Sequence, residues 1–304
     1  MRYLFFAVGL VLMFFSSASA QNLEVERRTF VYEDTLAMDI FLPKQSGTAL
    51  RPLLVYVHGG GFSGGNRGGG LDYCEYFAKK GWVTATISYH LTMKGQSFSC
   101  DQPVQNKIKT LLTAAQNVNQ ATAFLLAKKD EFNIDPSLVA ISGSSAGAEA
   151  VLQAAYWKES QENILPEAFK YAGVVSMAGA VLDLNWITKD SAMPTAMFHG
   201  TCDPLVPFSA AAHHYCSPDN TGFMMFFGSH AINEKLRSIN KGYYFVSSCG
   251  GGHEWAGRPM NTDYRYLTED FLENDVLNKK ARQIHFQMKH QMKDCKPEFE
   301  ICGQ

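Results

Sequence analysis

A serine between glycines is the first feature of this 304-residue chain that could do chemistry. The sequence Gly143-Ser144-Ser145-Ala146-Gly147 follows an apolar stretch, 138–141, that predicts a buried strand, and it precedes 148–155, which predicts a helix. A G-x-S-x-G sequence in that context forms a turn so sharp that it exposes the central hydroxyl, here Ser145, at a helix N-terminus. The helix dipole there favours a developing negative charge. The pattern is common by itself, so its weight depends on what accompanies it.

A glycine run follows another predicted strand farther upstream. Residues 53–57 are apolar and lead directly into His58-Gly59-Gly60-Gly61-Phe62. Glycines at such a place let backbone N–H groups point at a substrate oxygen. We therefore expect an oxyanion hole built from the N–H groups of Gly60, Gly61 and Ala146, each donor lowering the barrier by about 3 kcal/mol.

With these two motifs in this order, the chain resembles the α/β-hydrolases, in particular carboxylesterases related to hormone-sensitive lipase and to bacterial feruloyl esterases. The resemblance spans residues 30–277 and implies one α/β domain, with a mostly parallel sheet and helices on both faces. It differs at Ser144, where lipase-like relatives often carry an acidic residue, and at His90, which replaces an arginine. The resemblance also implies that an acid and then a histidine follow the serine along the chain.

The acid and the histidine are both found after late apolar stretches. Asp203 follows residues 196–200 in an H-G-x-x-D-x-x-V-P stretch like that of these esterases and of prolyl-oligopeptidase-like enzymes. His253 lies in a glycine-rich loop after residues 243–246. Asp183 is the rival acid, and the Asp203 motif is the sharper signal. In a Ser145, His253 and Asp203 triad, the imidazole takes the serine proton and the carboxylate fixes its tautomer.

The remaining candidates have weaker functional readings. Glu149 falls one helical turn after Ser145 and could approach the site, although a buried helix residue is the simpler interpretation. Adjacent His213 and His214 suggest no metal ligand set, so no metal and no cofactor are expected. We expect structural or solvated roles for the other histidines, which are His58, His90, His199, His230, His285 and His290. Candidate residues of a substrate pocket are Phe62, Trp186 and Trp255.

The first twenty residues are typical of a secretory signal peptide. Arg2 precedes an apolar core at 4–15, and Ala18-Ser19-Ala20 resembles a cleavage site. The catalytic domain is therefore predicted at 21–304, exported to the periplasm or the medium, without a membrane span. A formal net charge of −2 and the lack of a basic patch argue against nucleic acid as a partner. The oligomeric state is not predicted.

Seven cysteines in an exported chain allow three disulfides. The expected pairs are Cys295–Cys302, which would close a short polar loop, Cys74–Cys100, and Cys202–Cys249, for which Cys216 is a competing partner. Alternating strands and helices predict the layered fold. We expect an edge hairpin at 27–43, strands near 53–58, 82–89, 138–142, 172–178, 194–199 and 243–248, a long helix at 104–129, and a helical tail after Leu277.

The sequence thus predicts a secreted serine carboxylesterase acting on a small-molecule or polysaccharide-linked ester, with short-chain or carbohydrate-linked acyl groups. One alternative is a serine peptidase of the prolyl-oligopeptidase type, which the His-Gly-Gly-Gly loop disfavours. The other is an inactive hydrolase fold used for binding, which a complete triad disfavours.

Overall fold

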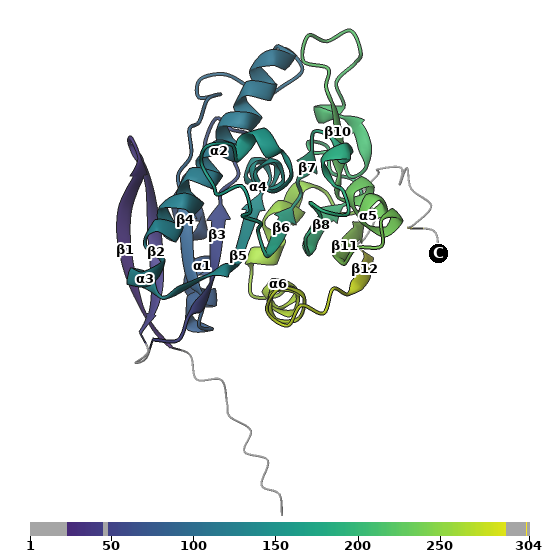
Figure 1. Cartoon of the computed structure of the whole chain (residues 1–304). Helices are drawn as coiled ribbons and strands as arrows, with labels where there is room; N and C mark the ends of the chain where they lie inside the picture. The colour runs from purple at the N-terminus through teal and green to yellow at the C-terminus, as the bar shows by residue number, and fades with distance from the viewer. Residues whose placement is uncertain (1–22, 45–47, 290–301, 303–304) are drawn as a thin grey trace, which may run out of the picture.

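A nine-stranded, mostly parallel sheet forms the centre of the molecule in a computed structural model that describes residues 23–44, 48–289 and 302 (Figure 1). The strand order is β1-β2-β4-β3-β5-β6-β8-β11-β12. The β1–β2 and β2–β4 pairs are antiparallel, and every pair from β4–β3 to β11–β12 is parallel. The strands of this sheet are β1 (Glu24–Glu33), β2 (Leu36–Lys44), β3 (Arg51–Val57), β4 (Val83–Ile87), β5 (Ile134–Ser144), β6 (Gly173–Met177), β8 (Thr195–Gly200), β11 (Tyr243–Cys249) and β12 (Gln283–Lys289).

Helices cover both faces of the sheet (Figure 1). The α-helices are α1 (Leu71–Lys79), α2 (Val104–Ala127), α3 (Lys129–Phe132), α4 (Ala146–Tyr156), α5 (Ser229–Ser238) and α6 (Arg265–Phe271). A small second sheet, β7-β10-β9, joins β7 (Ala180–Val181), β10 (Met225–Gly228) and β9 (Ala210–Ala212). The predicted α/β-hydrolase fold, in which strands and helices alternate along the chain, is therefore confirmed.

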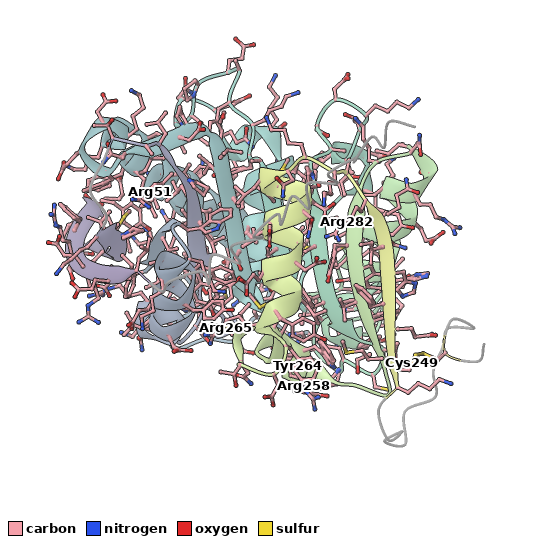
Figure 2. The ribbon with its side chains drawn as sticks, turned by 90° about the horizontal axis from the view of Figure 1, so that it is seen from below. Arg51, Cys249, Arg258, Tyr264, Arg265 and Arg282 are labelled. Atoms are coloured by element: carbon pink, nitrogen blue, oxygen red, sulfur yellow. A yellow bond between two sulfur atoms is a disulfide. The ribbon has the colours of Figure 1, made fainter. Side chains whose placement is uncertain are left out.

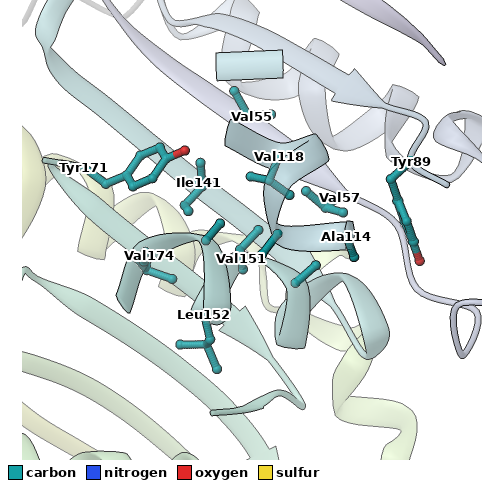
Figure 3. Close-up of a cluster of buried hydrophobic side chains, with 14 of the residues drawn as sticks. Val55, Val57, Tyr89, Ala114, Val118, Ile141, Val151, Leu152, Tyr171 and Val174 are labelled. Atoms are coloured by element: carbon teal, nitrogen blue, oxygen red, sulfur yellow. The ribbon is translucent and has the colours of Figure 1, made fainter. Parts of the chain in front are cut away.

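Alternation along the strands divides the core into two clusters. In β3, Val55 and Val57 pack with α2 and α4 on one face, whereas Leu54 and Tyr56 pack with α1 on the other. Figure 3 shows the first cluster, where valine and alanine side chains of α2 and α4 meet the strands. Buried on both faces, the central parallel strands read as continuous apolar runs, which is why the sequence predicted them well.

The predicted helical tail after Leu277 is wrong, because the chain forms strand β12 there. β12 pairs in parallel with β11, with Tyr243 opposite Gln283 and Cys249 opposite Lys289. Its side chains alternate between the two faces: Ile284 packs against the second core cluster, and His285 stacks on Phe245 at 4.6 Å between ring centroids. The period-two pattern of a half-exposed edge strand is weak in a stretch rich in Gln, Lys and His.

The three expected cysteine pairs are also wrong. The structure joins Cys100 to Cys216 and Cys249 to Cys302. Cys202 is disulfide-bonded too, whereas Cys74 is a buried free thiol in α1. The Cys249–Cys302 pairing agrees with the topology, because β12 runs in parallel beside β11 and its last residue, Lys289, lies opposite Cys249.

The N-terminal predictions fall outside this description. The proposed signal peptide at 1–20, with cleavage near Ala20, lies outside the described residues. Within the ranges that are described, no helix is long and apolar enough to cross a lipid bilayer.

Candidate active site

Ser145 occupies the sharp turn between β5 and α4, with φ 52° and ψ −123°. Such a positive φ is strained for a residue with a side chain, and the neighbouring glycines make it possible. A Cβ on Gly143 would lie 2.1 Å from the Gly147 carbonyl oxygen, and one on Gly147 would lie 2.2 Å from the Val57 carbonyl oxygen. The G-x-S-x-G spacing is thus dictated by contact of the turn with itself and with β3.

The structure brings Ser145, Asp203 and His253 together, although Asp203 is 58 residues after Ser145 and His253 is 50 residues after Asp203. The Ser145 hydroxyl donates to His253 Nε2 at 2.8 Å, and His253 Nδ1 donates to Asp203 Oδ2 at 2.7 Å. All three follow the carboxyl ends of parallel strands β5, β8 and β11, which meet at one edge of the sheet.

Asp203 is held by four contacts and is almost fully buried. Its Oδ1 accepts the backbone N–H groups of Leu205 and Val206 at 2.9 and 3.0 Å. Its Oδ2 faces two imidazoles, His253 Nδ1 and, at 3.3 Å, His199 Nε2. Burial alone would raise the pKa of Asp203, but the hydrogen bonds from His199 and His253 hold it well below its usual range. The carboxylate is therefore ionised at neutral pH.

His253 responds to that carboxylate in the opposite direction. Burial lowers its pKa, but the hydrogen bond and negative charge of Asp203 outweigh this and raise the pKa above the ordinary histidine value. The imidazole therefore holds its proton to a higher pH than a free histidine would. A base with a raised pKa is also a stronger proton acceptor once it is neutral.

The glycine loop after β3 lies against the elbow. Gly60 and Gly61 have φ values of 120° and 60°, and a Cβ on Gly60 would lie 2.3 Å from the Gly64 carbonyl oxygen. His58 fixes the loop, since its Nδ1 donates to the Gly59 carbonyl at 2.7 Å and its ring stacks on Tyr89. The three residues expected to form the oxyanion hole, Gly60, Gly61 and Ala146, line the same cavity as Ser145.

That cavity has a volume of about 540 Å³. Its lining residues are Gly59, Gly60, Gly61, Phe62, Phe98, Ser144, Ser145, Ala146, Glu149, Leu205, Val206, His213, His214 and His253. Phe62 was expected there. Glu149, which on sequence grounds could approach the site, lines it as well. Phe98, Leu205, His213 and His214 were not assigned to a pocket, because no local pattern encodes the proximity of their segments to the elbow.

The other two expected pocket residues are not among the lining residues. Trp186 stacks on Trp157 with ring centroids 5.0 Å apart. Trp255 is fully buried in the second core cluster, where it contacts Tyr264 and Arg258. Figure 2 shows Tyr264 and Arg258 together near one end of α6, beneath the sheet. Although it is only two positions after His253, Trp255 thus points away from the cavity.

The alternative candidates for the acid and the base make contacts elsewhere in the fold. Asp183 caps a short helical turn by accepting the N–H of Asn185 at 2.8 Å, and it is not among the lining residues of the cavity. His199 is fully buried, as expected, and its Nδ1 accepts from Ser229 at 2.9 Å. His230 lies in the first turn of α5. The described residues include no cluster of three or more potential metal ligands.

The fold is that of the α/β-hydrolases. The family model described as BD-FAE matches residues 38–183. Fumonisin B1 esterase of Sphingopyxis macrogoltabida is 32% identical over 133 residues, which is 42% of this chain and 24% of that protein. Juvenile hormone esterase of Tribolium castaneum is 28% identical over 50% of this chain and 24% of its own length. The chain thus spans about a quarter of the length of these curated relatives.

Solved structures support the same fold. Thermogutta terrifontis esterase 2 phosphorylated by paraoxon aligns with a TM-score of 0.59 and 17% identity, over 84% of this chain and 94% of that chain. The propionate-bound form of the same esterase aligns with a TM-score of 0.57 and 18% identity, over 86% and 96%. The chain thus has the α/β-hydrolase fold and, over part of its length, is similar in sequence to carboxylesterases.

Proposed function

We propose that this protein is a serine hydrolase of carboxylic esters. The observation that carries the proposal is the continuous hydrogen-bonded series from Ser145 Oγ through His253 to the buried Asp203 carboxylate, opening onto a cavity of about 540 Å³. A hydroxyl is a poor nucleophile until an adjacent neutral imidazole accepts its proton. The alignment of these three groups supplies that base and its orienting acid.

In the first half of the reaction, His253 Nε2 takes the hydroxyl proton as Ser145 Oγ bonds to the ester carbonyl carbon. The carbonyl oxygen becomes an oxyanion and accepts hydrogen bonds from the N–H groups of Gly60, Gly61 and Ala146. The imidazolium then gives its proton to the departing alkoxide oxygen. The C–O bond breaks, the alcohol leaves, and the acyl group remains on Ser145.

In the second half, water replaces the alcohol. His253 Nε2 takes a proton from water while the water oxygen attacks the acyl carbon, and the same N–H donors bind the new oxyanion. The imidazolium then protonates Ser145 Oγ as the acyl–oxygen bond breaks. A carboxylic acid is released, and the free enzyme is restored.

The substrate is proposed to be a small ester or an acyl ester on a carbohydrate, with a short acyl chain. The propionate-bound and butyrate-bound structures of Thermogutta terrifontis esterase 2 support short acyl groups, as does the modest volume of the cavity. Export is proposed as well. The Cys100–Cys216 and Cys249–Cys302 disulfides support it, because such bonds persist mainly in oxidising compartments.

The decisive experiment compares Ser145→Ala with Ser144→Ala on 4-nitrophenyl acetate and butyrate, with the matching 4-nitroanilides as amide controls. Ser145→Ala should lose essentially all turnover and all labelling by a fluorophosphonate. Ser144→Ala removes a hydroxyl that donates to the Ala256 carbonyl and contacts Tyr56, so it should keep activity within about tenfold of wild type. Turnover by Ser145→Ala near that of wild type would reject the mechanism, and faster cleavage of anilides than of esters would indicate a peptidase.

A further inference from the structure

The cavity contains a second carboxylate–imidazole pair that the triad does not use. Glu149 lies on α4, one helical turn after Ser145, and its Oε1 accepts a hydrogen bond from His213 Nε2 at 2.8 Å. Both side chains are 2% exposed, and both line the cavity. Because residues four apart on a helix share one face, the Glu149 carboxylate is on the side of the helix from which Ser145 acts.

This pair retains unused hydrogen-bonding capacity. Within the described part of the chain, Glu149 Oε2 accepts no hydrogen bond, and the buried Nδ1 of His213 has no partner. Nearby cavity walls are apolar, formed by the side chains of Phe62, Phe98 and Val206. Buried carboxylates are costly unless their oxygens accept hydrogen bonds. A substrate group that donates to Glu149 would meet that need.

The charge around the pair favours a neutral donor over a cation. The Lys107 ammonium is buried, donates to the Gly222 carbonyl at 2.8 Å and lies 5.4 Å from the Phe98 ring centroid. It interacts electrostatically with Glu149 and thereby offsets part of the carboxylate charge. A substrate ammonium would be repelled by Lys107, whereas a hydroxyl would not.

Building on the ester-hydrolase function proposed above, we propose that Glu149 and His213 form a specificity site for a substrate hydroxyl. The hydroxyl, carried on the acyl or the alcohol part of the ester, donates to Glu149 Oε2, and His213 holds the carboxylate in place through Oε1. A site built to bind a hydroxyl rejects an analogue that lacks it, because its polar group is then left without a partner. We expect esters with the hydroxyl to be preferred over methyl isosteres by roughly 10- to 100-fold in kcat/KM.

The test uses isosteric pairs of esters and measures acid release in a pH-stat. The acyl arm compares ethyl 3-hydroxybutyrate with ethyl 3-methylbutyrate and ethyl 6-hydroxyhexanoate with ethyl heptanoate. The alcohol arm compares 2-hydroxyethyl butyrate with propyl butyrate and 4-hydroxybutyl butyrate with pentyl butyrate. Wild type should prefer the hydroxyl ester in at least one arm, and the arm that responds identifies which part of the ester meets Glu149.

Variants then assign the preference to the pair. Glu149→Gln, which keeps a neutral acceptor, should lower the preference partly, and Glu149→Met should abolish it while hydrolysis of the methyl isosteres continues. Gln153→Met is the matched control: Gln153 is a fully buried polar residue one turn farther along α4 and is outside the cavity. It should leave the preference at the wild-type ratio.

Two results would overturn this proposal alone: equal kcat/KM within every pair for wild type, or equal losses on both members of a pair in Glu149→Met, the signature of a purely structural role. Wild type needs no substitution to fold, so the first result can always be obtained. If wild type hydrolyses none of the eight esters, the ester-hydrolase function itself is rejected, and this proposal with it.

Discussion

Replacing Asp203 by Asn tests the site through the tautomer of His253. Asp203 Oδ1 accepts two backbone N–H groups, from Leu205 and Val206, at 2.9 and 3.0 Å. In Asp203→Asn, only the amide oxygen can accept them, so the amide NH₂ must turn toward His253 Nδ1. The imidazole then accepts at Nδ1 and carries its proton on Nε2. It can no longer take the proton of Ser145.

The expected loss follows from that inversion. In a serine protease, the same change of Asp to Asn costs about 10⁴-fold in kcat through the wrong tautomer. At 1.36 kcal/mol per tenfold, this is about 5 kcal/mol of transition-state stabilisation. Because the two N–H groups fix the orientation of the amide here, we expect the full effect, with kcat falling roughly 10⁴-fold at neutral pH.

The assay is steady-state hydrolysis of 4-nitrophenyl butyrate, with thermal unfolding measured on the same samples. Asp183→Asn is the control, since Asp183 only caps a helical turn, and it should stay within a few-fold of wild type. The reasoning would be refuted if folded Asp203→Asn kept a tenth of wild-type turnover, or if Asp183→Asn lost as much as Asp203→Asn.

Two further predictions concern pH and the disulfides. Because the pKa of His253 is raised, kcat/KM should increase with pH as the imidazole loses its proton and then reach a plateau. The midpoint of this increase should lie above the ordinary histidine pKa of about 6.5. A midpoint at or below about 6.5 would contradict the coupling of His253 to Asp203. The sequence alone gave no reason to place this midpoint above about 6.5. The Cys100–Cys216 bond closes a loop of 116 residues, so the double variant Cys100→Ala/Cys216→Ala should lower the free energy of unfolding by roughly 5 kcal/mol in urea titrations. A change below about 1 kcal/mol would argue against this chain-entropy estimate.

Local sequence patterns were enough to predict the features that depend on residues close together in the chain. The buried parallel strands are continuous apolar runs, and the elbow glycines are required by contacts within one turn. Ser145, Asp203 and His253 each follow a strand, and parallel strands bring their carboxyl ends to one edge. That reasoning needed only the order of the strands along the chain and the family resemblance.

Contacts between distant segments could not be predicted in this way. Glu149 and His213 are 64 residues apart, and their pairing depends on how the chain after β9 packs over α4. Trp255 is of a residue type that often lines pockets, but the turn after His253 directs its side chain into the core. The Cys249–Cys302 bond depends on β12, whose weak alternation gave no sign of a strand.

The Cys249–Cys302 bond has a consequence for the order in which the molecule matures. Cys249 lies four residues before His253, at the start of the loop that presents the imidazole, and its partner is 53 residues farther along the chain. A ribosome or an export channel delivers the chain from its N-terminus, so this loop is covalently fastened only after those 53 residues have emerged. Ser145 and Asp203 are by then long available. Closure of the Cys249–Cys302 bond therefore comes after Ser145, Asp203 and His253 have all been delivered.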